Sequence, residues 1–401
     1  MKRDMRDEQK GLIFIALILV VVVVLSVVFK FALKTNVVET YTEDHKIVQT
    51  LFVVEDNEGS ILFSSLLFNN PSSYKAGFLN IPGYTGAIFN SIGRTDKIEA
   101  VYKEAGIQGY KTEVEKLLGV NEIPFYSIIK LDNFIKLVDY LGGLRVFISE
   151  PIDTVSENGE RWLLPSGAVT LDGDKIATYL SYRIEDETEY DVQERYQNCM
   201  AAFIAGIHNK KFEIFDKDNF KVYSDNIITN LNEDEEQTLF QLIAEADAES
   251  IIKQTITGSL RHVDDQYLLF PDNNGEFIKE AVKQMKNMLT SEDGNLSSRV
   301  YVLEIQNGTT IQGLARNTAI LFQKASYDVL TPVNANRNDY EETIIIDHIG
   351  NPEIAKIVGE FIHCTNIREI TEEEELEGFY SDANLDFSIV LGSDFDGRYV
   401  H

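Results

Sequence analysis

The longest uninterrupted apolar stretch lies near the start of the chain. Residues 11–29 read GLIFIALILVVVVVLSVVF and carry no charge. A helix of this length, at about 1.5 Å per residue, spans roughly 28 Å, which is close to the hydrocarbon thickness of a bilayer. The pattern therefore predicts a cytoplasmic tail over residues 1–10 and a transmembrane anchor over residues 11–33.

The charges on either side of this stretch indicate its orientation. More basic residues precede it than follow it, which favours a cytoplasmic N-terminus and an extracytoplasmic body: Lys2, Arg3, Arg6 and Lys10 against Lys30 and Lys34. The alternative is a cleaved signal peptide, but the apolar run exceeds a usual signal core and KFALKTN is the nearest cleavage candidate. We expect a single-pass protein of the cytoplasmic membrane whose body is periplasmic or at the cell surface.

Beyond the anchor, the apolar pattern alternates between strand and helix periods. Residues 46–55 and 60–68 have the composition of two strands joined by a polar turn. Residues 125–148 join a strand, an amphipathic helix and a second strand, and Gly142 and Gly143 end that helix by supplying positive φ. We also expect a short helix over 112–118 and a longer one over about 191–208, with a buried stripe: Val192, Tyr196, Cys199, Met200, Phe203 and Ile207. The alternation predicts an α/β domain with a central sheet flanked by helices.

A cluster of Ser, Gly, Asp and Asn at residues 288–299 indicates a boundary between two domains. We place the first domain at 34–290, a linker at 291–298 and a small αβ domain at 299–401. Within the second domain, a strand, a helix and another strand follow one another twice, and Pro352 stands in the first turn of the second helix. The acidic run 372–375 has the composition of a solvated loop.

Composition excludes several classes of protein. The 401 residues include 65 Asp plus Glu against 36 Lys plus Arg, for a net charge of −29, which argues against nucleic-acid binding. Cys199 and Cys364 have no disulfide or zinc spacing, so we expect both to be buried apolar residues. The six histidines form no HxxxH or HxH pair, and neither a Gly-x-Ser-x-Gly elbow nor a phosphate-binding GxxxxGK[ST] loop occurs.

Both domains contain motifs of one known architecture. Residues 299–395 resemble the LytR C-terminal domain in four places: Asn307-Gly308-Thr309, Gly313-Leu314-Ala315, Ser326-Tyr327-Asp328-Val329 and the stretch Asp386 to Phe395. Residues 47–290 are similar to the catalytic domain of the LytR-CpsA-Psr family in KIEAVYKEAG, in TEVEKLLGVNEIPFYSIIKLDNFIKLVDYLGGLRVFI, in LPSGAVTLDGDKIATYLSYR and in DNIITNLNEDE. An anchor ahead of both domains is also the arrangement of that family.

The resemblance implies a fold that encloses a polyprenyl chain and presents a pyrophosphate to basic residues and Mg²⁺. Members of the family move a glycopolymer from a polyprenyl-pyrophosphate carrier onto peptidoglycan. Such chemistry needs arginine forks and a metal held by carboxylates, because the leaving group carries several negative charges. The partners to expect are the cytoplasmic membrane and a polyprenyl-linked glycan, peptidoglycan or other envelope proteins.

Several positions of the family pattern differ in this chain. The family's Pro-Arg-Asp-Thr turn corresponds to Pro82-Gly83-Tyr84-Thr85, which lacks both charges. The family's upstream Arg-Ser-Asp-Thr segment falls near EGSILFSSLL, where there is no metal-binding aspartate. Serine takes the first place of the family's Arg-x-Arg motif, at Ser181. The resemblance therefore makes a Mg²⁺ site doubtful in this protein.

The resemblance leaves four candidate ligands for a pyrophosphate: Lys97, Arg183, Arg195 and Gln197. Six carboxylates lie between the two arginines, so the alternative is that these arginines form structural ion pairs. For Lys97, and likewise for Arg94, the alternative to ligand binding is a side chain that is simply exposed to solvent. The only tryptophan, Trp162, would lie either at the rim of a pocket or in the packing of a turn.

Two functional hypotheses follow from these residues. In the first, the protein is a catalytically degenerate member that binds lipid-linked glycan, glycan or envelope proteins. In the second, it remains an active phosphotransferase that moves a glycopolymer from polyprenyl pyrophosphate to peptidoglycan. A role as transcriptional attenuator would require contact with DNA, which an acidic extracytoplasmic body does not have.

Overall fold

The structure is a computed structural model, and it describes most of the chain beyond residue 35. Described are residues 15–16, 18–22, 36–148, 150–155, 159, 161–183, 187–216, 219–248, 250–291, 301–324, 327–371 and 385–401. Residues 15–16 and 18–22 are helical, but most of the predicted anchor and of the linker 291–298 lies outside the described residues. Among the residues described, no helix is both long enough and apolar enough to cross a membrane.

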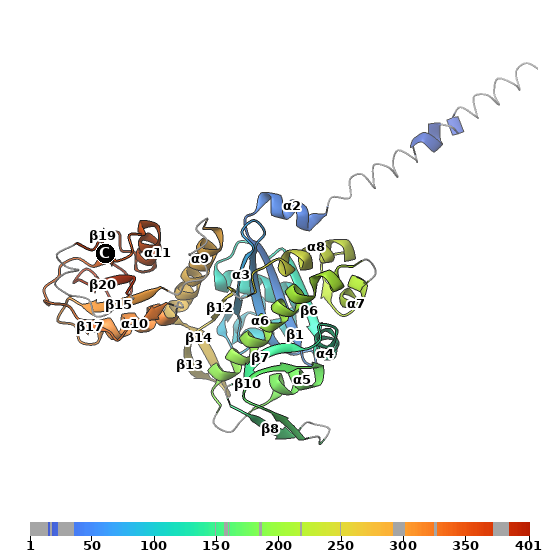
Figure 1. Cartoon of the computed structure of the whole chain (residues 1–401), viewed down its shortest axis with the longest axis horizontal. Coiled ribbons are helices and arrows are strands. Elements are labelled where there is room, and N and C mark those ends of the chain that lie inside the picture. The colour runs from blue at the N-terminus through green and yellow to red at the C-terminus, as the bar shows by residue number, and fades with distance from the viewer. Residues whose placement is uncertain are drawn as a thin grey trace, which may run out of the picture.

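A mixed sheet forms the centre of the first domain (Figure 1). Its strand order is β11-β6-β1-β2-β3-β12. The strands are β1 (Val48–Glu55), β2 (Ile61–Asn70), β3 (Lys75–Asn80), β6 (Phe125–Lys130), β11 (Ile228–Thr229) and β12 (Ile252–Thr255). β1 runs parallel to β6, and β3 runs parallel to β12, so the carboxyl ends of these strands meet at one edge. Strands β1 and β2 are buried along almost their whole length, because this sheet is covered on both faces.

Helices cover both faces of this sheet. On one face an apolar core joins the sheet to α4 (Leu131–Tyr140), α5 (Gly173–Ser181), α6 (Glu189–Ile214), α7 (Phe220–Ser224) and α8 (Glu233–Ala244). On the other face a second core joins it to α3 (Ile98–Leu118) and α9 (Glu276–Thr290). The short helix α2 (Val37–Asp44) is tied to α8 by the amide of Asn36, which donates to the Thr238 hydroxyl at 2.7 Å.

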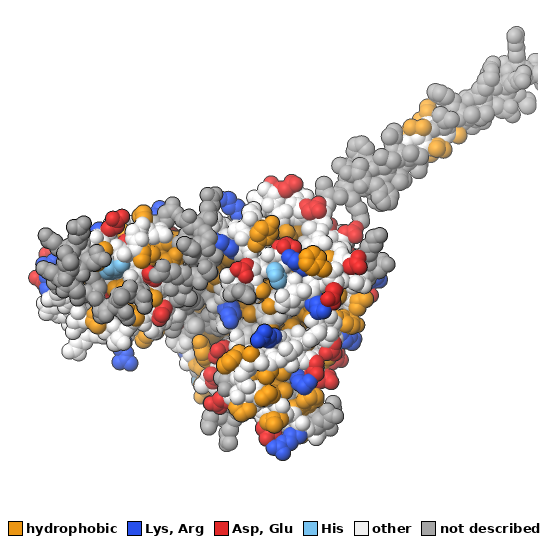
Figure 2. Space-filling view, viewed as in Figure 1, with side chains coloured by type: hydrophobic (Ala, Val, Ile, Leu, Met, Phe, Trp, Pro, Cys, Tyr) orange, Lys and Arg blue, Asp and Glu red, His pale blue; other side chains and the backbone are white. Residues whose placement is uncertain are grey.

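Four antiparallel strand pairs extend the first domain. They are β4 (Gly86–Phe89) with β5 (Arg94–Lys97), β7 (Leu144–Ile148) with β10 (Gly167–Leu171), β8 (Ile152–Val155) with β9 (Arg161–Leu164), and β13 (Gly258–Val263) with β14 (Gln266–Pro271). A single turn of 3₁₀ helix, η2 (Asp272–Gly275), precedes α9. Figure 2 shows apolar side chains gathered at the end of the molecule around β8, where Phe147, Val155 and Leu163 are exposed.

The second domain has its own sheet, in the order β16-β15-β20-β18-β19, and β17 pairs with β15 off this path. Its strands are β15 (Val302–Asn307), β16 (Asp328–Val329), β17 (Val333–Asn334), β18 (Ile344–Asp347), β19 (Ile367–Glu369) and β20 (Phe387–Leu391). The helices α10 (Leu314–Lys324) and α11 (Pro352–Ile362) pack on this sheet, and Pro352 opens α11 as predicted. In Figure 1 this domain lies beside α9 of the first domain.

Several predictions from the pattern are confirmed, and one helix begins earlier than predicted. The strand, helix and strand over 125–148 are β6, α4 and β7, and Gly142 and Gly143 have φ of 81° and 93°. The stripe from Val192 to Ile207 is buried along α6, and both cysteines are buried and free. The short helix expected at 112–118 is the last third of α3, which begins at Ile98. Gly106 has φ of 65° and forms a kink between the two parts of this helix. A glycine inside the segment hid the first part of the helix from the sequence pattern.

Candidate functional site

The carboxyl ends of the parallel strands form the edge where polar side chains of the first domain come together. The β1–β2 turn with Asp56 follows the end of β1, and Asp132 follows the end of β6 in the first turn of α4. Loops at the carboxyl ends of parallel strands diverge around a crevice, which is where α/β sheets commonly bind ligands. The sheet topology therefore brings together carboxylates that are 76 positions apart in the sequence.

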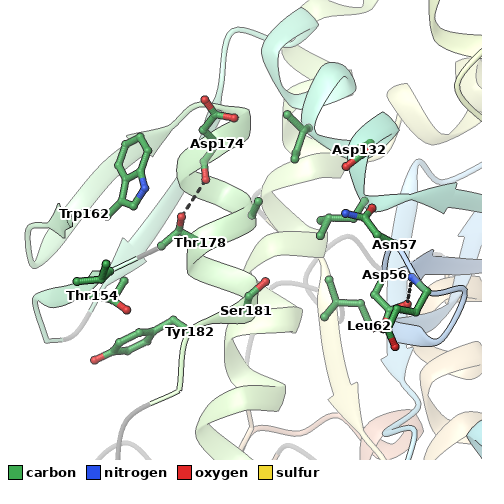
Figure 3. A pocket seen from close by; sticks show the side chains of 15 residues that line it. Asp56, Asn57, Leu62, Asp132, Thr154, Trp162, Asp174, Thr178, Ser181 and Tyr182 are labelled. Atoms are coloured by element: carbon green, nitrogen blue, oxygen red, sulfur yellow. Dashed lines mark hydrogen bonds between the residues drawn. The ribbon is translucent and has the colours of Figure 1, made fainter. Parts of the chain in front are cut away.

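A cleft of about 610 Å³ lies at this edge (Figure 3). The β1–β2 turn, β2 and α4 form one wall, while β8, β9 and α5 form the other. The lining includes four carboxylates, one indole and several hydroxyl groups: Asp56, Glu58, Asp132, Asp174, Trp162, Thr154, Thr178, Ser181 and Tyr182. Trp162 thus lies at a pocket, which is one of the two alternatives that the sequence left open.

Local hydrogen bonds fix the turn that carries Asp56. Its Oδ1 accepts the backbone amides of Glu58 at 2.9 Å and Ser60 at 2.8 Å. An aspartate side chain that accepts amides two and four residues later replaces the backbone pairing of a longer loop. Asp56 is therefore held at the cleft while one of its carboxylate oxygens is already engaged.

Arg195 lies in the second turn of α6, and its guanidinium is bound by groups of the same chain. Nη1 and Nη2 donate to the two carboxylate oxygens of Glu187, and Nη2 also donates to the Tyr182 carbonyl at 2.6 Å. The side chains are only 11% and 3% exposed, for Arg195 and Glu187 respectively. Burial, and after it the charge of Arg183, lowers the pKa of the Arg195 guanidinium.

The start of α6 explains why Glu187 reaches Arg195. Thr188 is the N-cap, and its side chain and that of Asp191 form a reciprocal capping box. The cap fixes the direction in which the chain enters the helix, so the preceding residue, Glu187, folds back over the second turn. The structural ion pair that the sequence left open as an alternative is present for Arg195.

Arg183 lies close to Arg195 but has different partners. Its Nη1 donates to the Tyr182 carbonyl at 3.0 Å, the same oxygen that Arg195 binds, and its Nη2 donates to the Tyr196 hydroxyl at 3.1 Å. The side chain is exposed. The structure thus brings together the two predicted arginines, one buried in an ion pair and one facing solvent.

The other candidate ligands are distributed over different elements. Gln197 is also on α6, where its Nε2 donates to the Thr255 hydroxyl of β12 at 2.5 Å. Lys97 ends β5 and forms an ion pair with Glu99 at 2.9 Å, and Arg94 on the same strand pairs with Asp96 and Glu104. No contact joins Lys97 to either predicted arginine among the hydrogen bonds and ion pairs of the described residues.

The turn after β3 carries no charge at the two positions that differ from the family pattern. Gly83 lies beside Glu99, whose Cβ is 3.7 Å from the position that a Cβ on this glycine would take. Burial, and then the nearby Glu189, raises the pKa of Tyr84 to about 12, so this phenol is neutral at physiological pH. Neither position supplies a cation or a metal ligand.

Sequence reasoning missed three features of this region: Asp132 and Asp174 line the cleft, and Glu187 forms an ion pair with Arg195. Asp132 was detectable, because a carboxylate directly after a predicted parallel strand lies at the ligand-binding edge. The positions of Asp174 and Glu187 depend on how α5 and the start of α6 pack against the rest of the domain. The local sequence pattern does not contain that information.

Two family models match the chain. The LytR_cpsA_psr family matches residues 77–287, and a model described as LytR cell envelope-related transcriptional attenuator matches residues 300–395. Both matches agree with the resemblance seen in the sequence.

Curated relatives match part of the chain. A polyisoprenyl-teichoic acid–peptidoglycan teichoic acid transferase TagU of Halalkalibacterium halodurans is 31% identical over 137 residues, 34% of this chain and 43% of the relative. A protein of the same name from Bacillus mycoides is 28% identical over 172 residues, 41% of this chain and 53% of the relative. The match thus spans about half the length of these relatives.

Solved structures share the fold of the first domain at low identity. TagV of B. subtilis superposes with a TM-score of 0.52 at 22% identity, covering 60% of this chain and 98% of that one. The protein gbs0355 of Streptococcus agalactiae gives 0.54 at 17%, covering 63% and 91%. A structure titled TagT bound to LIIa-WTA gives 0.50 at 19%, covering 61% and 92%.

Proposed function

Because the chain belongs to the LytR-CpsA-Psr family, we propose that it acts in the assembly of cell-wall glycopolymers as a member that binds glycan without transferring it. One observation carries this proposal. The cleft at the carboxyl edge is lined by four carboxylates, and no lysine or arginine is among its lining residues in the described part of the chain.

Electrostatics oppose a pyrophosphate in this cleft. Two like charges about 4 Å apart near a protein surface repel by about 4 kcal/mol, and a pyrophosphate would meet several such contacts. Ser181 lines the cleft where the family pattern has an arginine, and Arg195 is already neutralised by Glu187. Arg183 is the one candidate arginine that keeps its charge exposed.

The donor set does not fit Mg²⁺. No group of three or more His, Cys, Asp or Glu side chains is close enough to hold a metal in the part of the chain that the structure describes. One oxygen of Asp56 is used by two backbone amides. The proposed function therefore involves no metal ion.

The same lining is suited to a ligand rich in hydroxyl groups. Ionised carboxylates accept hydrogen bonds from sugar hydroxyls, while Thr154, Thr178 and Ser181 can both donate and accept. The partly exposed indole of Trp162 offers an apolar face against which the C–H face of a sugar ring can pack. Glycan binding thus uses the groups that disfavour pyrophosphate.

The proposal includes a location. The apolar residues 11–29 would anchor the chain in the cytoplasmic membrane and place both domains outside it, where polyprenyl-linked glycan, peptidoglycan and envelope proteins are found. The net charge of −29 argues against contact with nucleic acid.

The test is a transfer assay with the purified full-length protein, Mg²⁺ and a glycan linked to a polyprenyl pyrophosphate, alongside a TagU-type transferase as positive control. We expect no cleavage of the pyrophosphate. We also expect the protein to bind isolated cell-wall glycan and Trp162→Ala to weaken that binding, whereas Tyr267→Ala, which removes an exposed ring elsewhere, should not.

Transfer activity would contradict the proposal. If the protein transfers glycan, and Arg183→Ala or Arg195→Ala abolishes transfer while the fold is retained, the chain is an active phosphotransferase. Those two arginines would then be its pyrophosphate ligands.

A further inference from the structure

A second cavity, of about 300 Å³, lies where the two domains meet. The first domain contributes residues of α6 and of the segment that begins with β12, and the second domain contributes residues of α10. The lining residues are Tyr190, Gln193, Glu194, Gln197, Lys253, Gln254, Thr255, Thr257, Ile320 and Gln323. Neither domain alone supplies all walls of this cavity.

The floor of the cavity is the outer edge of the central sheet. β12 is an edge strand that pairs only with β3 among the described strands, and the backbone amide of Ile256 just after it donates to the Asn80 carbonyl. Alternate residues of a parallel strand direct their backbone groups to opposite sides, so Lys253 and Thr255 direct theirs away from β3. The edge therefore offers backbone donors and acceptors beside the side chains of α6.

The side chains around this edge are mostly neutral and polar. Amides and hydroxyls predominate, and the single cation Lys253 is balanced by the single anion Glu194. Apolar surface comes from Tyr190, which is 70% exposed, and from Ile320, which is 42% exposed. A lining of this kind favours an uncharged ligand that has both hydroxyl groups and an apolar face.

We propose that this cavity is a saccharide-binding site shared by the two domains. Glutamine amides donate and accept hydrogen bonds at once, which matches the mixed demands of sugar hydroxyls and acetamido groups. Tyr190 and Ile320 would pack against the C–H faces of the ring. The volume is at the lower end of ligand pockets and suits one or two sugar rings.

A peptide strand added to the edge of β12 is the competing occupant. β12 covers only Ile252–Thr255, and two of its residues direct backbone groups outward, so an added strand would gain few ladder hydrogen bonds. The amide side chains on α6 and α10 would have no regular partners on such a strand. The observations therefore favour a saccharide.

The inference rests on the proposed function for the choice of polymer, but the cavity is distinct from the cleft that contains Trp162. No residue lines both. The two sites can thus be tested with separate variants of the full-length chain.

The experiment titrates the detergent-solubilised full chain with the uncharged disaccharide of two N-acetylglucosamine units, by isothermal titration calorimetry. We expect saturable binding that Gln323→Ala and Ile320→Ala each weaken about five- to tenfold, because each removes a contact from the second domain. Gln312→Ala, an exposed glutamine of the same domain outside the cavity, is the matched control and should leave the affinity unchanged. Tyr190→Phe should retain binding, and Tyr190→Ala should lose it.

Three outcomes would overturn the inference. The wild-type chain does not bind the disaccharide; Gln323→Ala and Ile320→Ala bind as well as wild type; or a short stem peptide binds instead and is sensitive to these substitutions. If binding is lost in Trp162→Ala but not in Gln323→Ala, the saccharide occupies the other cleft, so the proposed function stands and the shared site does not. If the protein transfers glycan from a pyrophosphate carrier and the disaccharide still binds in this cavity, the shared site stands and the proposed function is wrong. Because Gln323 and Ile320 are exposed, unchanged thermal unfolding of their variants verifies that the fold is retained.

Discussion

Arg195 and Glu187 are joined through two nitrogens and two oxygens, and both side chains are almost completely buried. Removing one member of a buried ion pair leaves the other charge without compensation. We expect Glu187→Gln to lower the free energy of unfolding by about 3 kcal/mol, because the buried Arg195 guanidinium would keep its charge without a compensating carboxylate. Urea denaturation followed by circular dichroism measures the loss.

The control for this pair is Glu189→Gln, which neutralises an exposed carboxylate in the first turn of the same helix. It should lower the free energy of unfolding by only about 0.3–1 kcal/mol, because a carboxylate in the first turn interacts favourably with the helix dipole. A combined replacement of Glu187 and Arg195 by leucine and methionine should be less destabilising than Glu187→Gln. An equal loss in the combined variant would mean that packing, rather than charge compensation, explains the effect.

Glu236 on α8 makes the stability of the first domain depend on pH. Its carboxylate is buried and accepts a hydrogen bond from the Ser224 hydroxyl, and its other oxygen has no partner. Burial, opposed by the Ser224 hydrogen bond and assisted by the nearby charges of Glu233 and Asp225, raises its pKa from 4.5 to about 7. A pKa higher in the folded than in the unfolded state favours folding fully below pH 4.5, and that contribution is lost as the pH rises through 7.

Glu236→Gln should therefore raise the melting temperature at pH 8, and the difference from wild type should shrink as the pH falls toward 4.5. Thermal unfolding at a series of pH values between 4 and 8 tests this directly. Glu150→Gln, at an exposed position, should show no such pH-dependent difference. A gain that is the same at every pH would show that packing of the amide, not titration of Glu236, is responsible.

The hydrophobic pattern predicted the elements that bury a regular stripe or a continuous strand. α6, α4 and β1 are of this kind, because each presents apolar residues at the period of its own secondary structure. The pattern did not identify β12 or the β8–β9 pair, whose strands of four residues each bury only one side chain. Their existence depends on pairing with distant strands, and a short sequence window does not contain that information.

The site was predictable to a similar degree. The positions of Arg183 and Arg195 came from motif order, and the structure brings these two residues together at the Tyr182 carbonyl. That Glu187 would neutralise Arg195 was not predictable, since any of six carboxylates in the segment could have reached it. The choice among them is made by the capping box at Thr188, which is a three-dimensional feature.

The orientation of the chain in the membrane is a separate prediction. If residues 11–29 anchor the protein with its body outside, a cysteine replacing Asn57 in the exposed β1–β2 turn should react with an impermeant maleimide in intact spheroplasts. Cys199 and Cys364 are buried and should contribute little background. Labelling that occurs only after lysis would show that the body lies on the cytoplasmic side. A cysteine replacing Lys2 is the control for the opposite side of the membrane.

Phe277 of α9 belongs to the apolar core of the second domain, although it precedes the predicted linker. Its ring packs edge-on against Phe361 of α11, with centroids 5.5 Å apart. The guanidinium of Arg398 lies over both rings, and its Nη1 donates to the Phe361 carbonyl at 2.9 Å. The ion pair of Lys283 with Glu360, at 3.7 Å, adds a polar contact between the same helices. Helix α9 thus joins the two domains through the core of the second.

This arrangement refines the prediction that the second domain folds by itself. A fragment of residues 295–401 contains its own sheet and two helices and should unfold cooperatively, but it lacks the ring that covers Phe361. A fragment of residues 272–401, which includes α9, should be more stable by about 3 kcal/mol, the usual cost of removing a buried phenylalanine. In the full chain Phe277→Ala should produce a loss of similar size, whereas Phe212→Ala, at a position 85% exposed, should be nearly neutral. Calorimetry of both fragments decides the matter: equal stabilities would show that the second domain completes its core without α9, and a non-cooperative 295–401 fragment would show that it needs α9 to fold at all.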